Sequence, residues 1–371
     1  MATLRLGLAV RRSDIGLFVI TLSLLLVGLG ALFSVSLNAT TGGRDLVLRQ
    51  ALIAIGGLIA ALILIRMDFR ILGGLHWVIY GIGLASLLAV LIAGQTIRGT
   101  TGWFVVGPLQ LQPVEFVKVI MAIVLAKVMS DDLGNVRRWS FIFRSGAVIA
   151  APVALTMAQP DFGSAIVLLG MWAVMIMLAP VPRYRLLLLL GAAIVVGVVA
   201  WTTVLRPYQQ ERVLTFLNPT RDTLGAGYNV RQALAAIGSG GWLGRGLGLG
   251  PQSQLNFLPE RQTDFIFASI SEELGFLGGG TVIILFGLFF FRLVRLMIRV
   301  ADPYAGLLVL GLGSVFLIHA VVNIGMNLGV LPVTGIPLPF VSYGGSALLA
   351  NCLMLGVIQS VAARTGNRPR D

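Results

Sequence analysis

The chain has 371 residues, of which 57% are hydrophobic and only 11% are charged. Soluble domains carry roughly 25% charged residues, so this composition excludes a water-soluble globular protein. The single cysteine, Cys352, excludes an internal disulfide bond and a zinc site built from cysteines.

Long runs without charged residues predict membrane-spanning helices. A helix needs about 20 mostly apolar residues to cross a hydrocarbon core roughly 30 Å thick. Four runs reach that length without Asp, Glu, Lys or Arg: residues 15–43, 71–97, 162–182 and 186–205. A longer run, 303–363, contains prolines near its middle and therefore predicts two spans joined by a loop.

Ten helices are expected in all, which predicts an all-α integral membrane protein with a single polytopic domain over residues 1–371. The apolar run behind the basic start of the chain is longer than the roughly 7 to 15 residues of a secretory signal, so we expect it to remain as an anchor. The expected helices cover residues 15–37, 48–65, 75–94, 113–129, 142–158, 162–179, 185–204, 273–292, 304–328 and 346–363.

The distribution of basic residues predicts the orientation of these helices. With the amino terminus in the cytoplasm, 17 of the 27 Lys and Arg residues fall in the inner termini and short inner loops. Short outer loops then hold only Arg44, Arg49 and Arg98. This asymmetry follows the positive-inside rule, and an even number of helices places both termini in the cytoplasm. Topology thus accounts for nearly all of the net charge of +12, and we expect no nucleic-acid partner.

Residues 205–272, between the seventh and eighth helices, form the one long connection. Loops of this length are usually functional or disordered, and recurring apolar and aromatic residues argue against disorder. We therefore expect a structured extracytoplasmic loop with short helices at the outer leaflet, such as one over residues 228–237. Its glycine-rich stretch, 238–250, predicts either close backbone packing or a nest of amides that binds phosphate.

Four ionisable residues fall inside or at the edge of predicted spans: Glu115, Lys118, Asp161 and Asp264. An uncompensated charge in a membrane costs about 2.5 kcal/mol or more, so each marks a candidate site. Glu115 and Lys118 lie three residues apart on one helix face, where they either lock two helices as an ion pair or reach a substrate. Asp161 is suited to cap the sixth helix. Asp264 is better explained by function, because Thr263 is able to supply a cap there.

The two histidines, His76 and His319, are far apart in the sequence, and neither suggests a metal site. Hydrogen bonds between packed helices are the expected role for both.

Seven short motifs occur along the chain: QPVEFVK (112–118), QPDFG (159–163), FLNP (216–219), AIGSGG (236–241), QLNFLPERQTDFIF (254–267), EELG (272–275) and LPFVSYGG (338–345). In this order, and over essentially the whole chain, they resemble the SEDS family (shape, elongation, division and sporulation). The short ends and the form of LNFLPER are most similar to its elongation branch, RodA. One departure is Gln262, where the family commonly has histidine.

The resemblance implies a peptidoglycan glycosyltransferase of the bacterial cytoplasmic (inner) membrane, which polymerises lipid II into glycan strands at the outer face during elongation and rod-shape maintenance. It also implies a class B penicillin-binding protein as the transpeptidase partner, with undecaprenyl-linked glycan and membrane lipid as further ligands. Carried over by motif, Asp264 corresponds to the family's essential aspartate. Glu115, Lys118 and Asp161 match other functionally sensitive positions, which we assign to substrate binding.

Transfer from a lipid-linked sugar pyrophosphate requires a base for the acceptor hydroxyl and positive charge for the leaving group. Asp264 is the expected base. Arg206 and Arg212 are expected to bind the pyrophosphate, because they lie at the entry to the long loop. Lys118 or a divalent cation, Mg²⁺ or Mn²⁺, is the alternative source of that charge, so no cofactor is assigned.

Two other classes of function remain open. A flippase or transporter of lipid-linked precursors also uses charged residues within a helical bundle. No clear internal repeat is present, however, and the singled-out acids lie toward the outer ends of their helices. A non-catalytic scaffold agrees less well with several costly charges at membrane depth.

Overall fold

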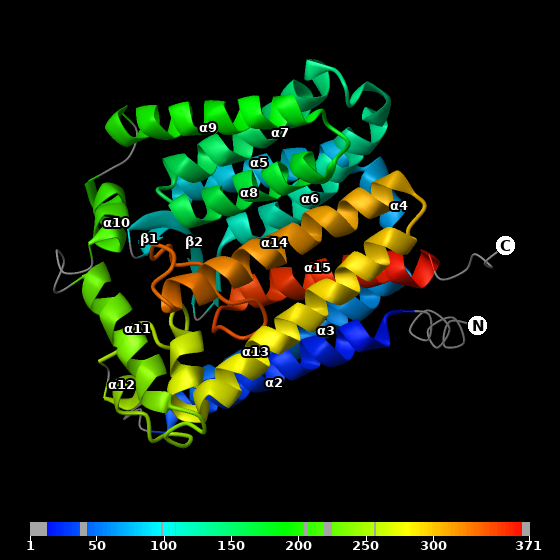
Figure 1. The fold of residues 1–371 in the computed structure, drawn as a ribbon. Helices are drawn as coiled ribbons and strands as arrows, with labels where there is room; N and C mark the ends of the chain where they lie inside the picture. The colour runs from blue at the N-terminus through cyan, green and yellow to red at the C-terminus, as the bar shows by residue number, and fades with distance from the viewer. Residues whose placement is uncertain are drawn as a thin grey trace, which may run out of the picture.

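The computed structural model describes residues 13–37, 43–97, 99–107, 109–203, 207–218, 225–255 and 257–365. Long helices run side by side and form the body of the molecule, and a small sheet and several short helices gather at one end (Figure 1). We call this end, with strands β1 to β3 and helices α10 to α12, the sheet end.

All ten predicted helices are present. The short helices are α4 (Phe69–Gly74), the 3-10 turn η1 (Leu133–Asn135), α10 (Pro207–Leu217), α11 (Ala226–Gly240), which contains the predicted helix over 228–237, and α12 (Pro251–Gln254). The long helices are α2 (Ile15–Ser36), α3 (Gly43–Arg66), α5 (His76–Ala93), α6 (Pro113–Asp131), α7 (Trp139–Ala158), α8 (Phe162–Leu178), α9 (Arg183–Thr203), α13 (Ile266–Arg299), α14 (Pro303–Asn327) and α15 (Gly345–Thr365).

Within the described residues, eight of these helices are long and apolar enough to cross a membrane. Helix α8 has 17 residues, just under the usual length, and α6 carries charged residues at both ends. Both pack against α14 inside the bundle, so protein rather than lipid surrounds most of α6. The chain is therefore a multi-pass membrane protein in which α6, with its charged residues, lies inside the bundle.

Helix α15 is the most enclosed of the candidate spans and α9 the least. In α15, 83% of the apolar window is buried, chiefly against α3, whereas none of the α9 window is buried. Because the exposed side chains of α9 are aliphatic, its surface matches a lipid environment.

The first and last long helices meet at the end opposite the sheet. The Asp14 amide donates to Gln359 Oε1 at 2.9 Å, and Gln359 Nε2 donates to the Asp14 carbonyl at 2.9 Å. The two ends of the described chain therefore lie on the same side of the bundle, in agreement with an even number of crossings (Figure 1).

A three-stranded antiparallel sheet occupies a segment for which the sequence predicted only a loop. Its strands are β1 (Gln95–Ile97), β2 (Thr100–Val106) and β3 (Leu109–Leu111), in the order β1-β2-β3. Glycines 99 and 107 lie between strands with φ of +80° and +60°, a conformation that glycine adopts without strain. The Thr101 amide donates to the Gln159 carbonyl at 3.2 Å, which fixes the sheet to the end of α7.

Helix α13 begins at Ile266, seven residues before the predicted start at 273. The predicted start was wrong because the loop was extended to Glu272, whereas Glu272 and the next residue, Glu273, are both buried within the helix. Their side chains accept hydrogen bonds from loop groups, namely the amides of Gly248, Gln252 and Ser253 and the Gln254 side chain, at 2.8–3.3 Å. The two carboxylates thus stabilise the loop that covers the start of α13.

The glycine-rich stretch packs directly against the backbone of α13, so the first of its two predicted roles is confirmed. A Cβ atom at Gly240 or Gly244 would overlap the main chain of Ser271 or Glu273. The amides of Arg245 and Gly246 donate to the carbonyls of Glu272 and Glu273 at 3.0 Å. These two amides bind groups of the chain itself, so they do not contribute to the phosphate nest that was the second predicted role.

Replacement of Gly275 tests this packing. Gly275 lies at a kink in α13 with φ of 66° and ψ of −161°, and a Cβ atom there would overlap the Trp242–Gly244 backbone. We expect Gly275→Ala to lower the unfolding temperature in detergent, because such backbone strain costs about 1–3 kcal/mol. Gly280→Ala is the matched control, since a Cβ at Gly280 meets open space on the same helix. Equal unfolding temperatures for the two variants would contradict this account of the kink.

Candidate active site

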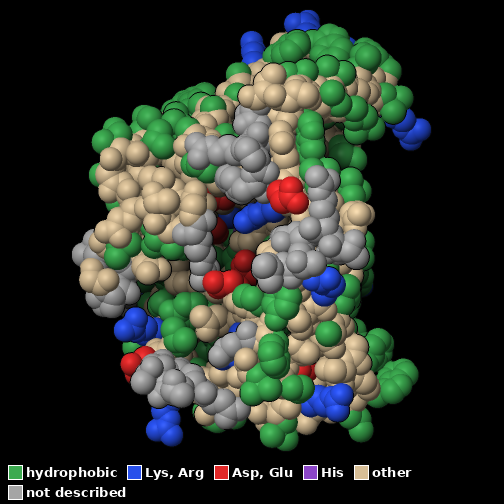
Figure 2. All heavy atoms as spheres, turned by 90° about the vertical axis from the view of Figure 1, so that its left-hand side faces the viewer, with side chains coloured by type: hydrophobic (Ala, Val, Ile, Leu, Met, Phe, Trp, Pro, Cys, Tyr) green, Lys and Arg blue, Asp and Glu red, His purple; other side chains and the backbone are tan. Residues whose placement is uncertain are grey.

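The four ionisable residues singled out from the sequence line one cavity of about 130 Å³. Three segments far apart in the chain supply them: the start of α6, the start of α8 and the turn before α13. Viewed from the sheet end, the molecule is hollowed near its centre, and acidic and basic side chains are visible in the hollow (Figure 2). The fold therefore brings these four residues to one location.

Glu115 and Lys118 form a buried ion pair on α6. Lys118 Nζ lies 2.8 Å from Glu115 Oε1, and the side chains are only 2% and 7% exposed. Pro113 begins the helix, where its missing N–H costs no hydrogen bond, and this start directs both side chains into the cavity. Each charge is thus neutralised locally, as a low-dielectric environment requires.

Lys118 has a second partner on another helix. Its Nζ lies 3.3 Å from His319 Nε2 of α14, and His319 Nδ1 lies 3.3 Å from the Pro337 carbonyl. A carbonyl only accepts, so Nδ1 carries the proton and Nε2 is free to accept from the lysine. His319 therefore does make the hydrogen bonds between helices that the sequence predicted, but they lead into the cavity.

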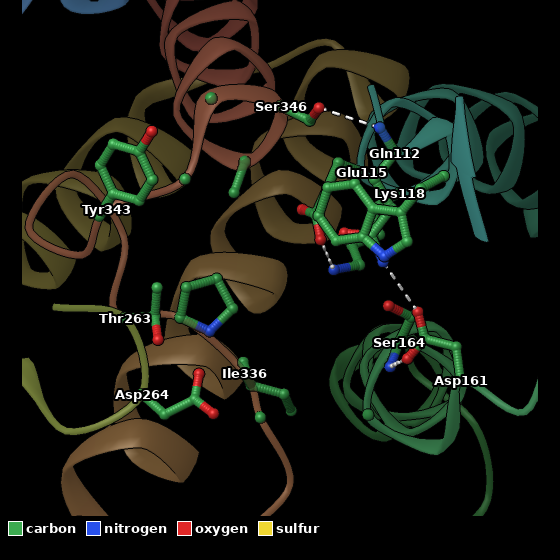
Figure 3. Close-up of a pocket in the computed structure, with 17 residues that line it drawn as sticks. Gln112, Glu115, Lys118, Asp161, Ser164, Thr263, Asp264, Ile336, Tyr343 and Ser346 are labelled. Atoms are coloured by element: carbon green, nitrogen blue, oxygen red, sulfur yellow. Dashed lines mark hydrogen bonds and ion pairs between the residues drawn. The ribbon is translucent and has the colours of Figure 1, made fainter. Parts of the chain in front are cut away.

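Asp161 caps α8, as predicted, and also lines the cavity. Its Oδ1 accepts from the Ser164 amide at 3.0 Å, and Oδ2 accepts from Gln112 Nε2 at 3.2 Å. The backbone amide of Gln112 in turn donates to Ser346 Oγ at 2.9 Å. The capping residue therefore joins the starts of α6, α8 and α15 around the cavity (Figure 3).

Asp264 lies on the opposite side of the cavity from Asp161, Glu115 and Lys118 (Figure 3). It does not cap α13, because Phe265 occupies the cap position. Its carbonyl accepts from the Nδ2 atoms of Asn323 and Asn327 at 3.0 and 2.9 Å. The backbone of this partly buried residue is therefore held by α14, and its carboxylate faces the cavity.

The segment that precedes Asp264 is also fixed to the loop before α15. Ser342 Oγ donates to the Thr263 carbonyl at 2.6 Å, and the Tyr343 amide donates to the Gln262 carbonyl at 2.8 Å. The contact at Gln262 uses the main chain, so it does not depend on whether this position is glutamine or histidine.

Arg261 lies just before this segment, and its guanidinium donates a hydrogen bond to the Ser253 carbonyl. Burial lowers the pKa of Arg261, and the negative charge of Glu273 opposes that shift. Arg261 is outside the cavity lining, so its charge contributes to loop packing.

Only one of the two predicted pyrophosphate ligands lies in the part of the chain that the structure describes, and it is not a lining residue of the cavity. Arg206 lies outside the described residues, and Arg212 lies on α10, apart from the cavity lining. Within the lining, three carboxylates face one ammonium group, which gives a formal charge of −2. Among the described residues, no group of three or more His, Cys, Asp and Glu side chains is arranged to hold a metal ion. No step proposed below therefore passes through a metal.

Several lining residues were missed by the sequence analysis. Trp103, on β2, is the only tryptophan among the described lining residues, and Tyr343, Ser346 and Gln112 supply uncharged polar groups. Trp103 lies on a strand that the sequence did not predict, and nothing in its local pattern indicates a site. Gln112 and Tyr343 do belong to motifs of the resembled family, which is the signal that would have found them.

Comparison with known proteins gives consistent results. A family of cell cycle proteins represented by FtsW, RodA and SpoVE matches residues 15–367. The chain is 37% identical over 359 residues to stage V sporulation protein E of Bacillus subtilis, with 94% of this chain and 96% of the relative covered. It is 32% identical over 428 residues to peptidoglycan glycosyltransferase RodA of Treponema pallidum, with 95% and 98% covered.

Solved structures show the same similarity. A chain from a study of how a peptidoglycan synthase complex coordinates polymerization and crosslinking has a TM-score of 0.80 and 32% identity, with 96% of this chain and 99% of that chain covered. The crystal structure of the rod shape determining protein RodA from Thermus thermophilus has a TM-score of 0.71 and 30% identity, with 96% and 98% covered.

The buried ion pair of α6 makes a prediction for stability. Lys118→Met would leave the Glu115 carboxylate buried without its partner, so we expect a loss of about 3–5 kcal/mol in the free energy of unfolding. The double variant Glu115→Gln/Lys118→Met removes both charges and should recover most of that loss. Thermal or denaturant unfolding in detergent measures the difference.

Lys127→Met is the matched control on the same helix. Lys127 pairs with Asp131 at 2.6 Å, but the side chains are 30% and 56% exposed, and exposed pairs contribute about 0–1 kcal/mol. If Lys118→Met and Lys127→Met cost the same, burial does not make the Glu115–Lys118 pair important.

Proposed function

Since this chain belongs to the SEDS family of cell cycle proteins, whose members include FtsW, RodA and SpoVE, we propose that its cavity polymerises lipid II with Asp264 as the general base. The chain is a peptidoglycan glycosyltransferase, the activity for which its FtsW and RodA relatives are named. One observation carries the proposal. Four costly ionisable side chains from separate segments converge on a single cavity at one end of a membrane bundle.

The proposed reaction is a single displacement at the anomeric carbon of the lipid-linked strand. The Asp264 carboxylate takes the proton of the acceptor 4-hydroxyl as its oxygen attacks that carbon. The new glycosidic C–O bond forms while the bond to the pyrophosphate breaks, and the pyrophosphate leaves with the electron pair. One inversion changes an α-linkage to a β-linkage, so one carboxylate is sufficient and no covalent intermediate is required.

Positive charge for the leaving pyrophosphate is the least complete part of the site. The lining has a formal charge of −2, and the Lys118 ammonium is already shared by Glu115 and His319. We therefore keep Arg206 and Arg212 as candidates, since they lie at the entry to the long extracytoplasmic loop. Lys118 is proposed to orient substrate oxygens rather than to neutralise the whole leaving group.

The orientation of the bundle is proposed from its charges. Arg66, Arg70, Arg138 and Arg364 lie at the end opposite the sheet, together with both ends of the described chain. The positive-inside rule then makes the sheet end the outer side of the bacterial cytoplasmic membrane, with both termini cytoplasmic. The cavity would accordingly open where lipid II is consumed, and the lipid tail would lie along apolar helix surfaces such as that of α9.

We propose a class B penicillin-binding protein as the partner and cell elongation as the process. Support for the partner comes from the similarity to a chain of a peptidoglycan synthase complex that couples polymerization to crosslinking. Support for elongation is the sequence style of the RodA branch, although the identities of 37% to SpoVE, 34% to FtsW and 32% to RodA do not separate the branches. The FtsW and RodA relatives are named as glycosyltransferases, which favours polymerisation over the transport alternative.

Asp264→Asn tests the proposed base. Removal of a general base typically costs 10²- to 10⁴-fold, so we expect glycan polymer formation from labelled lipid II in detergent to fall by about 100-fold or more. Asp131→Asn makes the same chemical change at an exposed position. Asp131 is the last residue of α6, at the end away from the cavity, so this variant should retain wild-type turnover. A folded Asp264→Asn protein with undiminished polymer output would refute the assignment of the base.

Trp103 offers a flat apolar surface beside the charged side chains of the cavity, and we expect it to bind the face of a sugar ring. Trp103→Ala should therefore raise the KM for lipid II by about tenfold, equivalent to about 1.4 kcal/mol of binding, with a smaller effect on kcat. Trp103→Phe keeps an aromatic face and should recover most of the affinity. An unchanged KM in Trp103→Ala would exclude this role.

A further inference from the structure

Helix α14 carries three buried polar side chains at four-residue spacing: His319, Asn323 and Asn327. Residues spaced i, i+4 and i+8 lie on one face of a helix. Their exposed fractions are 1%, 0% and 0%. Polar side chains at membrane depth are expensive unless they are hydrogen-bonded, so a row of three requires a reason. We call this row the α14 ladder.

The residues of the ladder contact opposite sides of the cavity. His319 contacts Lys118 of α6 and the Pro337 carbonyl, as described above. Asn323 Nδ2 donates both to the Asp264 carbonyl at 3.0 Å and to the Ile336 carbonyl at 2.8 Å. Ile336 and Pro337 themselves line the cavity. Two neighbouring ladder residues thus hold two consecutive carbonyls of one cavity wall.

Asn327 caps the start of α13 from another helix. Ala268 is the third residue of α13, and the first amides of a helix have no carbonyl partner within it. The Ala268 amide donates to Asn327 Oδ1 at 3.0 Å, and Asn327 Nδ2 donates to the Asp264 carbonyl at 2.9 Å. One asparagine side chain therefore satisfies a terminal amide of α13 and also fixes the peptide that carries the Asp264 carboxylate.

The contacts converge on two functional groups. Asp264 is held through its carbonyl by two ladder residues, and Lys118 is held through its ammonium by the third. Gly335, next to Ile336, completes the arrangement, because a Cβ atom there would lie only 3.6 Å from Asp264 Oδ2. The rigid helix α14 is thus the common reference for both sides of the cavity.

We propose that the α14 ladder is a positioning element that sets the Asp264 carboxylate relative to Lys118 and the 335–337 wall. This inference rests on the proposed function, in which Asp264 is the base. His319, Asn323 and Asn327 do not touch the reacting atoms; they act through Asp264 and Lys118. Misplacement of a catalytic group by about 1 Å can cost 100-fold in rate, so such positioning is measurable.

The chemistry of the ladder explains its composition. Both Asn323 and Asn327 must donate to carbonyl oxygens, and Asn327 must also accept from an amide. An aspartate has the same shape but only accepts when ionised, so it would face the Asp264 carbonyl without a donor. A leucine at either position would fill the space but remove one of the two side-chain donors to the Asp264 carbonyl.

Asn323→Ala and Asn327→Ala test the proposal in the full-length protein with labelled lipid II in detergent. We expect kcat to fall by about 10- to 100-fold while the KM for lipid II changes by less than about twofold. Rates are compared per mole of monodisperse protein. Asn351→Ala is the matched control, because Asn351 is a buried asparagine on α15 outside the cavity lining. It should leave both constants within about twofold of wild type.

A pair of variants at His319 keeps the proposal testable if an asparagine variant does not fold. His319→Leu removes the acceptor for Lys118 and should lower kcat, whereas His319→Gln can both accept and donate and should restore most of the rate. A general loss of packing would not distinguish these two replacements by hydrogen bonding. Equal rates in His319→Leu and His319→Gln would therefore count against positioning through Lys118.

Asp264→Asn, measured in the same assay, separates the two proposals. If Asp264→Asn retains wild-type polymerisation, the assignment of the base is wrong, and the ladder loses the group that it is proposed to position. If Asp264→Asn is inactive but Asn323→Ala and Asn327→Ala have wild-type kcat, only the ladder is refuted. The ladder is likewise refuted if Asn351→Ala loses as much kcat as Asn323→Ala.

Discussion

The desolvation of charge governs this structure. A carboxylate or ammonium group at membrane depth is tolerated only when other groups of the chain replace the water that it loses. Lys118 has Glu115 and His319, Asp161 has the Ser164 amide and Gln112, and the Glu272 side chain has two loop amides. The contacts to His319, to Gln112 and to the loop amides join separate segments of the chain. The requirement to satisfy these groups therefore determines which segments meet at the sheet end.

The same requirement prepares the cavity for chemistry. Groups that are already held by hydrogen bonds need little reorganisation when charge develops in a reaction, which is the main source of electrostatic catalysis. Asp161 is held by a cap and Lys118 by two partners, while the Asp264 peptide is held by two asparagines. Flexible loops could not maintain such an arrangement, and here each residue is attached to a long helix or to a segment bound to one.

Much of the fold, and part of the site, could be predicted from the sequence. Runs without charge revealed the helices because lipid imposes a length and excludes charge, and the same rule singled out Glu115, Lys118, Asp161 and Asp264. It did not single out Glu272 and Glu273, because nothing in the sequence shows that these carboxylates are buried and satisfied by groups of the loop. Strands of three residues, such as β1 and β3, are too short for a detectable alternation.

Prediction from the sequence missed mainly the uncharged polar residues of the site, and the reason is physical. Holding a catalytic carboxylate with an arginine would add a second charge to be desolvated, whereas an asparagine amide donates and accepts at a much smaller cost. A membrane enzyme therefore gains by building its supporting contacts from Asn, Gln, Ser and neutral His. Because these residue types carry no charge, they do not interrupt an uncharged run such as 303–363, and Asn323 and Asn327 are distinguished only by their contacts. In such proteins, charge marks the reacting groups, and only the folded structure reveals what positions them.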